Sequence, residues 1–188
     1  MAMKHVLAGF AVSISLAGSG VVGSAVADDT CPVLLTVYGE ISNSNRGPID
    51  DFDDVLLYRL GGDFEQAYTF CREDLAALSQ TTITADYQNF TDGPVTATGP
   101  TLRAVLDAAG ASATPGDIVL TAVDGYQFVV PSDTDLSLLI AAIEANGSVL
   151  GFGDRGPVWI FGEPGVINDS AGETDEGLVW ALIMVEVE

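Results

Sequence analysis

The amino-acid sequence predicts an α+β fold, with a mixed β-sheet core and two or three helices. Short runs of β-branched and aromatic residues, bounded by Gly, Pro, Asn or Asp, recur along the chain and indicate strands. Two other segments repeat apolar residues at helical spacing. The two kinds of segment follow one another in mixed order, which favours the α+β class.

The first strand is expected over residues 34–39, which are β-rich and end at a glycine. Residues 42–54 are rich in Ser, Asn, Gly and Asp and indicate a loop. A second short strand is expected over 55–59, because Gly61-Gly62 interrupts the chain directly afterwards. The next elements expected are a short helix over 73–78 and a β-branched strand over 81–85.

The middle of the chain predicts a strand followed by an amphipathic helix. Residues 95–98 alternate as a strand does, after an Asp-Gly-Pro turn. Gly99-Pro100 then opens a helix, with Pro in the first turn, where its missing N–H costs nothing. The apolar residues expected to form the buried face of that helix, which ends at Gly110, are Leu102, Val105, Leu106 and Ala109.

Asp124-Gly125 is the strongest hairpin signal in the chain, and it separates strands expected over 118–123 and 126–130. Leu136, Leu139, Ile140 and Ile143 then predict a second amphipathic helix, ending near Asn146-Gly147.

The last part of the chain predicts two strands around an acidic loop. A strand is expected over 158–161 and a Gly-containing acidic loop over 167–177. Residues 178–187 are almost continuously apolar, which is typical of a strand covered on both faces. We therefore expect the final strand to be central in its sheet.

Residues 1–27 have the pattern of a secretory signal peptide. Lys4 and His5 precede an apolar stretch of small residues, and Ala25-Val-Ala27 has the small-x-small form of a cleavage site. A retained membrane anchor is the alternative, because the apolar stretch is long enough to span a bilayer. Cleavage would leave residues 28–188 as a single periplasmic or secreted domain, with no further contact with a membrane.

Two cysteines, Cys31 and Cys71, remain in that domain. In an oxidising compartment two cysteines indicate one disulfide, and two unrelated thiols are the alternative. A disulfide between them would close the loop from residue 31 to residue 71 and would stabilise the fold by about 4 kcal/mol on the chain-entropy model.

The charge of the domain excludes several classes of function. Loss of Lys4 and His5, the only lysine and histidine, leaves five arginines against 27 acidic residues, a net charge of −22. A surface this acidic repels nucleic acids and anionic lipids. Without histidine there is no Ser-His-Asp triad or histidine metal site, and without lysine no Schiff base or P-loop. The carboxylates of residues 50–54 lack the glycine and the distal glutamate of an EF-hand, so we expect a solvated loop and no metal site.

Three segments and one tryptophan, in a fixed order, carry a family resemblance. Residues 92–110 read DGPVTATGPTLRAVLDAAG, residues 120–131 read LTAVDGYQFVVP, and residues 154–161 read DRGPVWIF, followed by Trp180. Together they resemble the molybdopterin-binding domain of the sulfite oxidase family, and more closely its small secreted stand-alone members. The resemblance covers about residues 34–188 and implies a mixed, barrel-like sheet core that holds molybdenum by a dithiolene and one cysteine thiolate.

This sequence departs from the family pattern at three positions. The resemblance places the molybdenum-ligating cysteine in the segment 84–90, which contains none. Trp159 stands where the family has an arginine near the pterin phosphate, and Val179 replaces a lysine before the closing tryptophan. A doubly charged phosphate needs cations or oriented amides, which this acidic chain supplies poorly.

The segment 151–165, GFGDRGPVWIFGEPG, is therefore interpreted as a turn and a strand that border the former cofactor site. Arg155 is the first choice for an anion contact in any remaining pocket and Arg103 the second, while aromatic walls would suit a neutral or aromatic ligand. The candidate ligand-binding residues are Tyr87, Asn89, Arg103, Tyr126, Asp154, Arg155 and Trp159.

The sequence thus favours a non-catalytic, sulfite-oxidase-like domain without a cofactor, which binds a small molecule or a periplasmic protein as a sensory or accessory module. The alternative is a molybdopterin-dependent oxidoreductase of the sulfite oxidase family. A structural, partner-binding protein without a pocket is the third hypothesis, and an exposed apolar patch of a few hundred Å² would support it.

Overall fold

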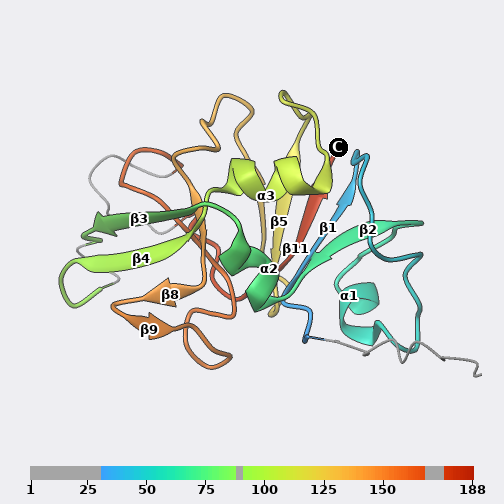
Figure 1. Cartoon of the computed structure of the whole chain (residues 1–188), viewed down its shortest axis with the longest axis horizontal. Coiled ribbons are helices and arrows are strands. Elements are labelled where there is room, and N and C mark those ends of the chain that lie inside the picture. Colours follow the sequence, from blue (N-terminus) through green and yellow to red (C-terminus); the bar gives the residue numbers. More distant parts are fainter. Residues whose placement is uncertain (1–30, 88–90, 168–175) are drawn as a thin grey trace, which may run out of the picture. The chain divides into compact units, whose positions relative to one another are not determined.

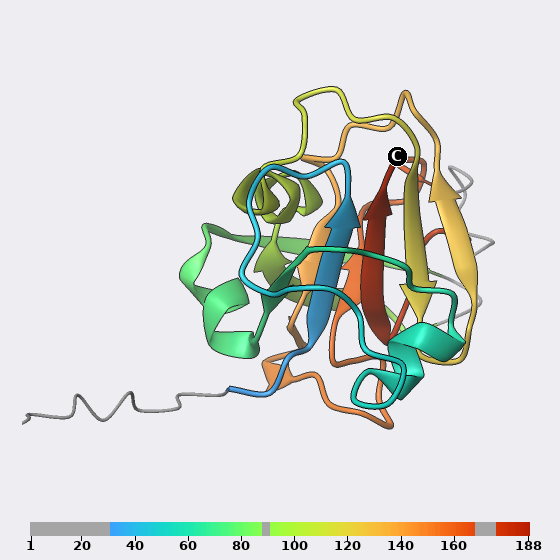
Figure 2. The same ribbon diagram turned by 90° about the vertical axis from the view of Figure 1, so that its right-hand side faces the viewer.

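The largest sheet has five strands in the order β2-β1-β11-β5-β6 (Figures 1 and 2). The structure is a computed structural model that describes residues 31–87, 91–167 and 176–188. β1 pairs with β11 in parallel and the other neighbours are antiparallel, so the sheet is mixed as expected. Its strands are β1 (Leu35–Gly39), β2 (Ala67–Phe70), β5 (Ile118–Ala122), β6 (Gln127–Val130) and β11 (Leu182–Val187).

The other strands form two smaller sheets. A four-stranded sheet has the order β3-β4-β8-β9, and β10 pairs with β7. The bounds are β3 (Gln80–Ala85), β4 (Val95–Pro100), β7 (Ile140–Ala142), β8 (Glu144–Ala145), β9 (Ser148–Val149) and β10 (Trp159–Phe161). The described strands do not close into a barrel, so the expected barrel-like core is corrected to three open sheets.

β11 confirms the prediction of a central final strand. It lies between β1 and β5, and its residues Leu182, Met184 and Val185 are almost fully buried. In Figure 2, β11 (dark red) runs beside β1 (blue). A nearly continuous apolar run suits this place because both faces of the strand are covered.

Three helices are present among the described residues: α1 (Val55–Arg59), α2 (Arg72–Ala77) and α3 (Leu102–Ala109). The apolar face predicted for α3 is confirmed, since all four of its residues are buried. Thr101, not Pro100, begins this helix. The Thr101 hydroxyl accepts from the Ala104 amide at 3.1 Å, while Pro100 ends β4. Gly110 ends the helix with a φ of 76°, as predicted.

The Asp124-Gly125 turn joins β5 and β6 into the predicted hairpin. Gly125 has a φ of 90°, which only glycine adopts readily, and its amide donates to the Ala122 carbonyl at 3.0 Å. The Asp124 carboxylate accepts from the Tyr126 amide at 3.0 Å, so local side-chain chemistry also supports the turn.

The helix predicted from Leu136 to Ile143 is wrong, because the segment begins with a turn and a bend and continues as the strand β7. The Ile143 amide donates to the Thr98 carbonyl at 2.9 Å, and the Leu139 carbonyl accepts from the Leu102 amide at 2.8 Å. The segment is apolar enough to be buried in either conformation. Backbone partners far away in sequence decide for the strand, and Asn146-Gly147 connects β8 to β9 instead of ending a helix.

The strand predicted over 55–59 is also wrong, because these residues form α1. The Asp50 carboxylate accepts from the amides of Phe52 and Asp53, and the Tyr58 amide donates to the Asp54 carbonyl at 3.0 Å. These local bonds begin a helical turn. β2, which the sequence did not predict, pairs with the edge of β1 that faces away from β11.

A disulfide joins Cys31 to Cys71, so the predicted pairing is confirmed. It links the segment before β1 to the first residue before α2. The predicted signal peptide lies in residues 1–30, outside the described part of the chain. Among the described residues, no helix is long and apolar enough to cross a membrane.

Candidate functional site

The candidate residues predicted from sequence do not gather in one pocket. Asn89 lies outside the described residues, and the other six fall into four separate places. Two aromatic residues belong to a buried core cluster, two polar residues lie at its edge, and the remaining two line different cavities. We take these places in turn.

Tyr87 and Trp159 are core residues, exposed by only 1% and 2%. They pack around Phe161, whose ring centroid is 5.8 Å from that of Tyr87 and 4.6 Å from that of Trp159. The Tyr87 hydroxyl donates to the Gly162 carbonyl at 2.8 Å, and the Trp159 indole N–H donates to the Leu178 carbonyl at 3.1 Å. Their polar atoms are thus satisfied by the protein itself.

Asp154 and Arg155 lie in the turn before β10. The Arg155 guanidinium lies over the Trp159 ring, 4.8 Å from its centroid, and the Arg155 carbonyl accepts from the Ala181 amide at 2.8 Å. The Asp154 side chain is exposed, and its amide donates to the Gly151 carbonyl at 3.2 Å. The segment that the sequence interpreted as a turn and a strand has that structure, and Arg155 covers the tryptophan that follows it.

Tyr126 lines a cavity of about 310 Å³ together with Asp124, Glu176 and Trp180. This cavity borders residues 168–175, which lie outside the described chain. We therefore build no site on it.

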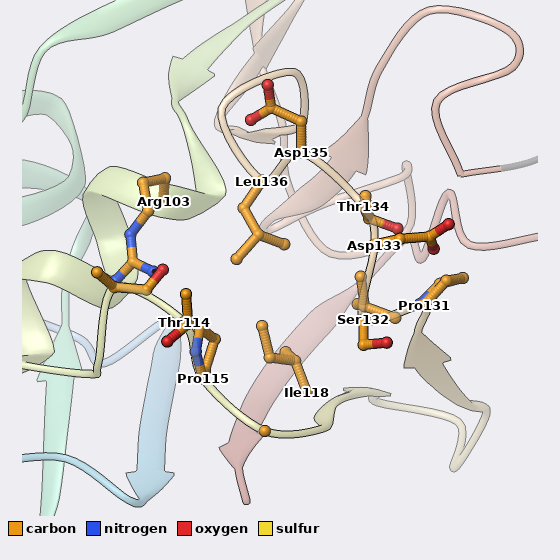
Figure 3. A pocket seen from close by; sticks show the side chains of 13 residues that line it. Arg103, Thr114, Pro115, Ile118, Pro131, Ser132, Asp133, Thr134, Asp135 and Leu136 are labelled. Carbon is orange, nitrogen blue, oxygen red and sulfur yellow. Dashed lines mark hydrogen bonds between the residues drawn. The ribbon is translucent and has the colours of Figure 1, made fainter.

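Arg103 lines a second cavity, of about 270 Å³, at the end of the five-stranded sheet (Figure 3). The cavity lies between the N-terminal turn of α3, the loop that leads into β5 and the loop that follows β6. In Figure 3, Arg103 is on one side of it, and Ser132 and Asp133 are on the other. The lining residues that carry polar side chains are Arg103, Thr114, Ser132, Asp133, Thr134 and Asp135.

The Arg103 guanidinium is only partly satisfied by the protein. Its Nη1 donates to the Ser112 carbonyl at 3.0 Å, and its Nη2 lies 2.7 Å from a carboxylate oxygen of Asp107, one turn later in α3. The contact between Nη2 and Asp107 is an ion pair, but its geometry is not that of a hydrogen bond. Nε is buried and has no hydrogen-bond partner among the described residues. A buried donor without an acceptor is costly, which marks this position for an external acceptor.

The loop opposite Arg103 carries Asp133 and Asp135, whose carboxylates point away from the centre of the cavity (Figure 3). The Asp135 carboxylate accepts from both the hydroxyl and the amide of Ser137, and these hydrogen bonds hold the pKa of Asp135 below its ordinary value. The carboxylate therefore stays ionised. With Asp107 next to Arg103, and Asp133 and Asp135 opposite, the cavity carries more negative than positive charge.

The sequence analysis named Arg103 but missed the wall that faces it. The missed residues follow β6 and read Pro131-Ser-Asp-Thr-Asp135. A run of five polar or turn residues directly after a strand is a detectable signal for a binding loop.

One group of potential metal ligands is found among the described residues, and it includes both cysteines. The sulfur atoms of Cys31 and Cys71 lie near a carboxylate oxygen of Glu73. The two sulfurs are bonded to each other, so neither is a thiolate that could bind a metal.

Comparison with known proteins supports the fold. No family model matches the chain, and no curated protein matches it. Among solved structures, the chain is similar to the sulfane dehydrogenase SoxCD from Paracoccus pantotrophus, with a TM-score of 0.53 and 17% sequence identity. The likeness covers 81% of this chain and 37% of that chain, so this protein spans well under half of its neighbour. At this identity the comparison shows a relation of fold alone, consistent with the sulfite-oxidase-type architecture that the sequence implied.

Proposed function

We propose that this chain is a secreted or periplasmic, non-catalytic domain of sulfite-oxidase-like fold that binds a small polar molecule in the Arg103 cavity. The observation that carries the proposal is the buried Nε of Arg103, which lacks an acceptor and belongs to a residue that lines the cavity. A ligand oxygen would satisfy it, and a bond to a charged donor is among the stronger hydrogen bonds.

The residues present do not fit a molybdenum cofactor held by cysteine. The chain contains two cysteines, and the disulfide engages both. A thiolate ligand must be a free, deprotonated sulfur. This donor set supports the proposal that the cofactor chemistry of the wider family has been lost, and we derive no reaction step through molybdenum.

The charges around the cavity favour a ligand with no net negative charge. Arg103 offers donors on one side, and the loop on the other side carries Asp133 and Asp135, whose carboxylates point away from Arg103 (Figure 3). A carboxylate alone would meet Arg103 but would be repelled by the opposite wall. A small zwitterion, such as an α-amino acid, can meet Arg103 with its carboxylate and brings no net negative charge into this acidic surrounding, and a volume of about 270 Å³ suits a molecule of that size.

The first experiment is elemental analysis for molybdenum, with native mass spectrometry and thiol titration, on protein purified from its own host without reductant. We expect no stoichiometric molybdenum, no pterin-sized adduct and no free thiol. Stoichiometric molybdenum, a pterin-sized adduct or two free thiols would contradict the proposal.

The second experiment tests the ligand class by thermal unfolding in the presence of millimolar amino acids, dicarboxylates and polyols. We expect at least one amino acid to raise the unfolding temperature of the protein, because binding to the folded state alone stabilises it. Arg103→Gln should abolish that rise. Arg59→Gln is the matched control, because Arg59 is exposed at the end of α1, and it should keep the rise. An equal response of both variants would exclude the Arg103 cavity as the site.

A molybdopterin-dependent oxidoreductase remains the second candidate function, because the fold is similar to that of a sulfane dehydrogenase. The molybdenum analysis distinguishes the two. Stoichiometric metal would mean that this chain holds molybdenum without a cysteine thiolate.

A further inference from the structure

A second hollow, of about 300 Å³, is lined by exposed apolar side chains, and we name it the α1 groove. Phe152, Val33, Val55 and Leu56 line it and are each between 45% and 67% exposed. An exposed Leu or Val alone is ordinary on a protein surface. Four large, exposed apolar side chains that share one hollow are unusual, and a patch of this kind marks an interaction site.

Three distant parts of the chain build the α1 groove. Val33 precedes β1, Val55 and Leu56 belong to α1, and Phe152 lies in the loop after β9. The Arg46 side chain and the first turn of α1 hold the groove in shape through the Arg46–Asp54 ion pair, in which Arg46 Nη1 donates to Asp54 at 3.1 Å.

The rim of the α1 groove is acidic. Asp53 lines the groove and is exposed, Asp50 and Asp51 are exposed in the same turn before α1, and Asp154 is exposed two residues after the lining residue Phe152. Arg46 is the cation that lines the groove, and Asp54 engages its charge. The whole chain has a formal net charge of −21, so the long-range field has the same sign as the rim.

We infer that the α1 groove docks a protein segment that presents an apolar anchor, such as Leu or Trp, flanked by lysines or arginines. The apolar lining matches the anchor, and the acidic rim complements the flanking cations, which gives a specific encounter. Two copies of this chain repel each other through their net charge, and anionic lipid is repelled in the same way, so neither is the favoured occupant.

The test uses protein purified from cells that express the full chain, together with three fluorescent peptides. Lys-Lys-Leu-Trp-Lys-Lys carries both features, Lys-Lys-Ala-Ala-Lys-Lys lacks the anchor, and Glu-Glu-Leu-Trp-Glu-Glu reverses the charge. Fluorescence anisotropy should show binding of the first peptide, with an affinity that falls as salt rises. Binding of all peptides alike, or of the second as tightly as the first, would overturn the inference.

Three variants locate the site. Phe152→Ser and Leu56→Ser should each weaken binding of the first peptide about ten-fold or more, as loss of a central anchor contact does. Val129→Ser is the matched control, because Val129 is 53% exposed in β6 and does not line the groove. It should leave binding unchanged, and an equal loss in this variant would overturn the inference.

Other occupants of the groove are separate outcomes of the same set of experiments. Sedimentation that shows a dimer, abolished by Phe152→Ser, would assign the groove to a second copy and overturn the proposed partner. Co-sedimentation with phosphatidylserine vesicles, lost in the same variant, would assign it to a membrane. Because the α1 groove and the Arg103 cavity share no lining residue, either proposal can fail without the other.

Discussion

Arg155 and Arg103 are both arginines that the sequence singled out as anion contacts, yet the structure places them in opposite environments. Arg155 lies over the Trp159 ring and covers a core cluster whose polar atoms are satisfied by the protein. Arg103 lines a cavity and keeps a buried Nε without a hydrogen-bond partner. The sequence around Arg155 is the more conspicuous of the two, but packing within the protein explains its structure.

The difference shows that a conspicuous motif and an unsatisfied polar atom carry different information. Gly, Pro and Trp around Arg155 specify a turn, a strand and a buried ring. Arg103 stands in an ordinary amphipathic helix, and only the surrounding loops make it a candidate for binding. The Arg103 position is the stronger functional candidate, because its protein partners leave a donor free.

The largest effect that would sharpen this comparison is expected from Trp159→Ala. Removing a buried aromatic side chain should lower the free energy of unfolding by about 3–5 kcal/mol. Urea denaturation of the variant and the parent protein measures this loss. Under conditions where the variant is folded, the amino-acid response of the Arg103 cavity should persist. A loss below about 1 kcal/mol would show that Trp159 is not the structural residue described here.

Arg103→Leu tests the other half of the comparison, with Arg72→Leu as its matched control. Arg72 donates from both Nη atoms, to the carbonyls of Ile143 at 3.0 Å and Leu150 at 2.7 Å, so its loss should cost about 2 kcal/mol. Arg103→Leu should cost about 1 kcal/mol or less, because it also removes the unpartnered Nε. Both values come from chemical denaturation. The reverse order of the two losses would break the comparison.

Arg155→Leu should have a smaller effect on stability. The variant loses the contact between the guanidinium and the Trp159 ring, which is worth about 0.5–1 kcal/mol at a partly exposed site. It should leave the response to amino acids unchanged, because Arg155 does not line the Arg103 cavity. Thermal unfolding with and without the amino acid measures both quantities, and a lost response would return Arg155 to the list of binding residues.

The smallest effect concerns a third arginine, Arg46, which donates from both Nη atoms to the carboxylate of Asp54. Its hydrogen bonds are the first cause that lowers the pKa of Asp54 below its ordinary value. A pKa lowered by folding adds stability above the unfolded pKa of about 3.9, and this stability is lost as pH falls through the folded pKa.

Asp54→Asn should therefore reduce the acid sensitivity of folding, by less than about 1 kcal/mol, since the pair is partly solvated. Unfolding free energies at several pH values between 7 and 3 test this expectation. The same slope in the variant and the parent protein would show that the Arg46–Asp54 pair does not contribute.

Local signals predicted a large part of the fold. The Asp124-Gly125 hairpin, the buried face of α3 and its Gly110 end are all encoded within a few residues of where they act. The mixed α+β class was predicted from the strand and helix spacing of apolar residues. The disulfide was predicted from two cysteines, for which one intramolecular pairing exists. The sequence also predicted Arg103 as a binding residue, but without the loops that form its cavity.

The sequence by itself determined the elements whose hydrogen bonds join residues that are near each other in the chain. It also determined the acidic charge and the central apolar strand β11. Only the tertiary structure decided that residues 140–142 form a strand, because their partners are 17 to 21 residues away in β10, and Ile140 also forms a bridge with Thr101, 39 residues before it and next to β4. It also decided that Arg103 lines a cavity whereas Arg155 lies over the Trp159 ring. Satisfaction of a buried donor depends on every segment packed around it, and no local pattern specifies that set of neighbours.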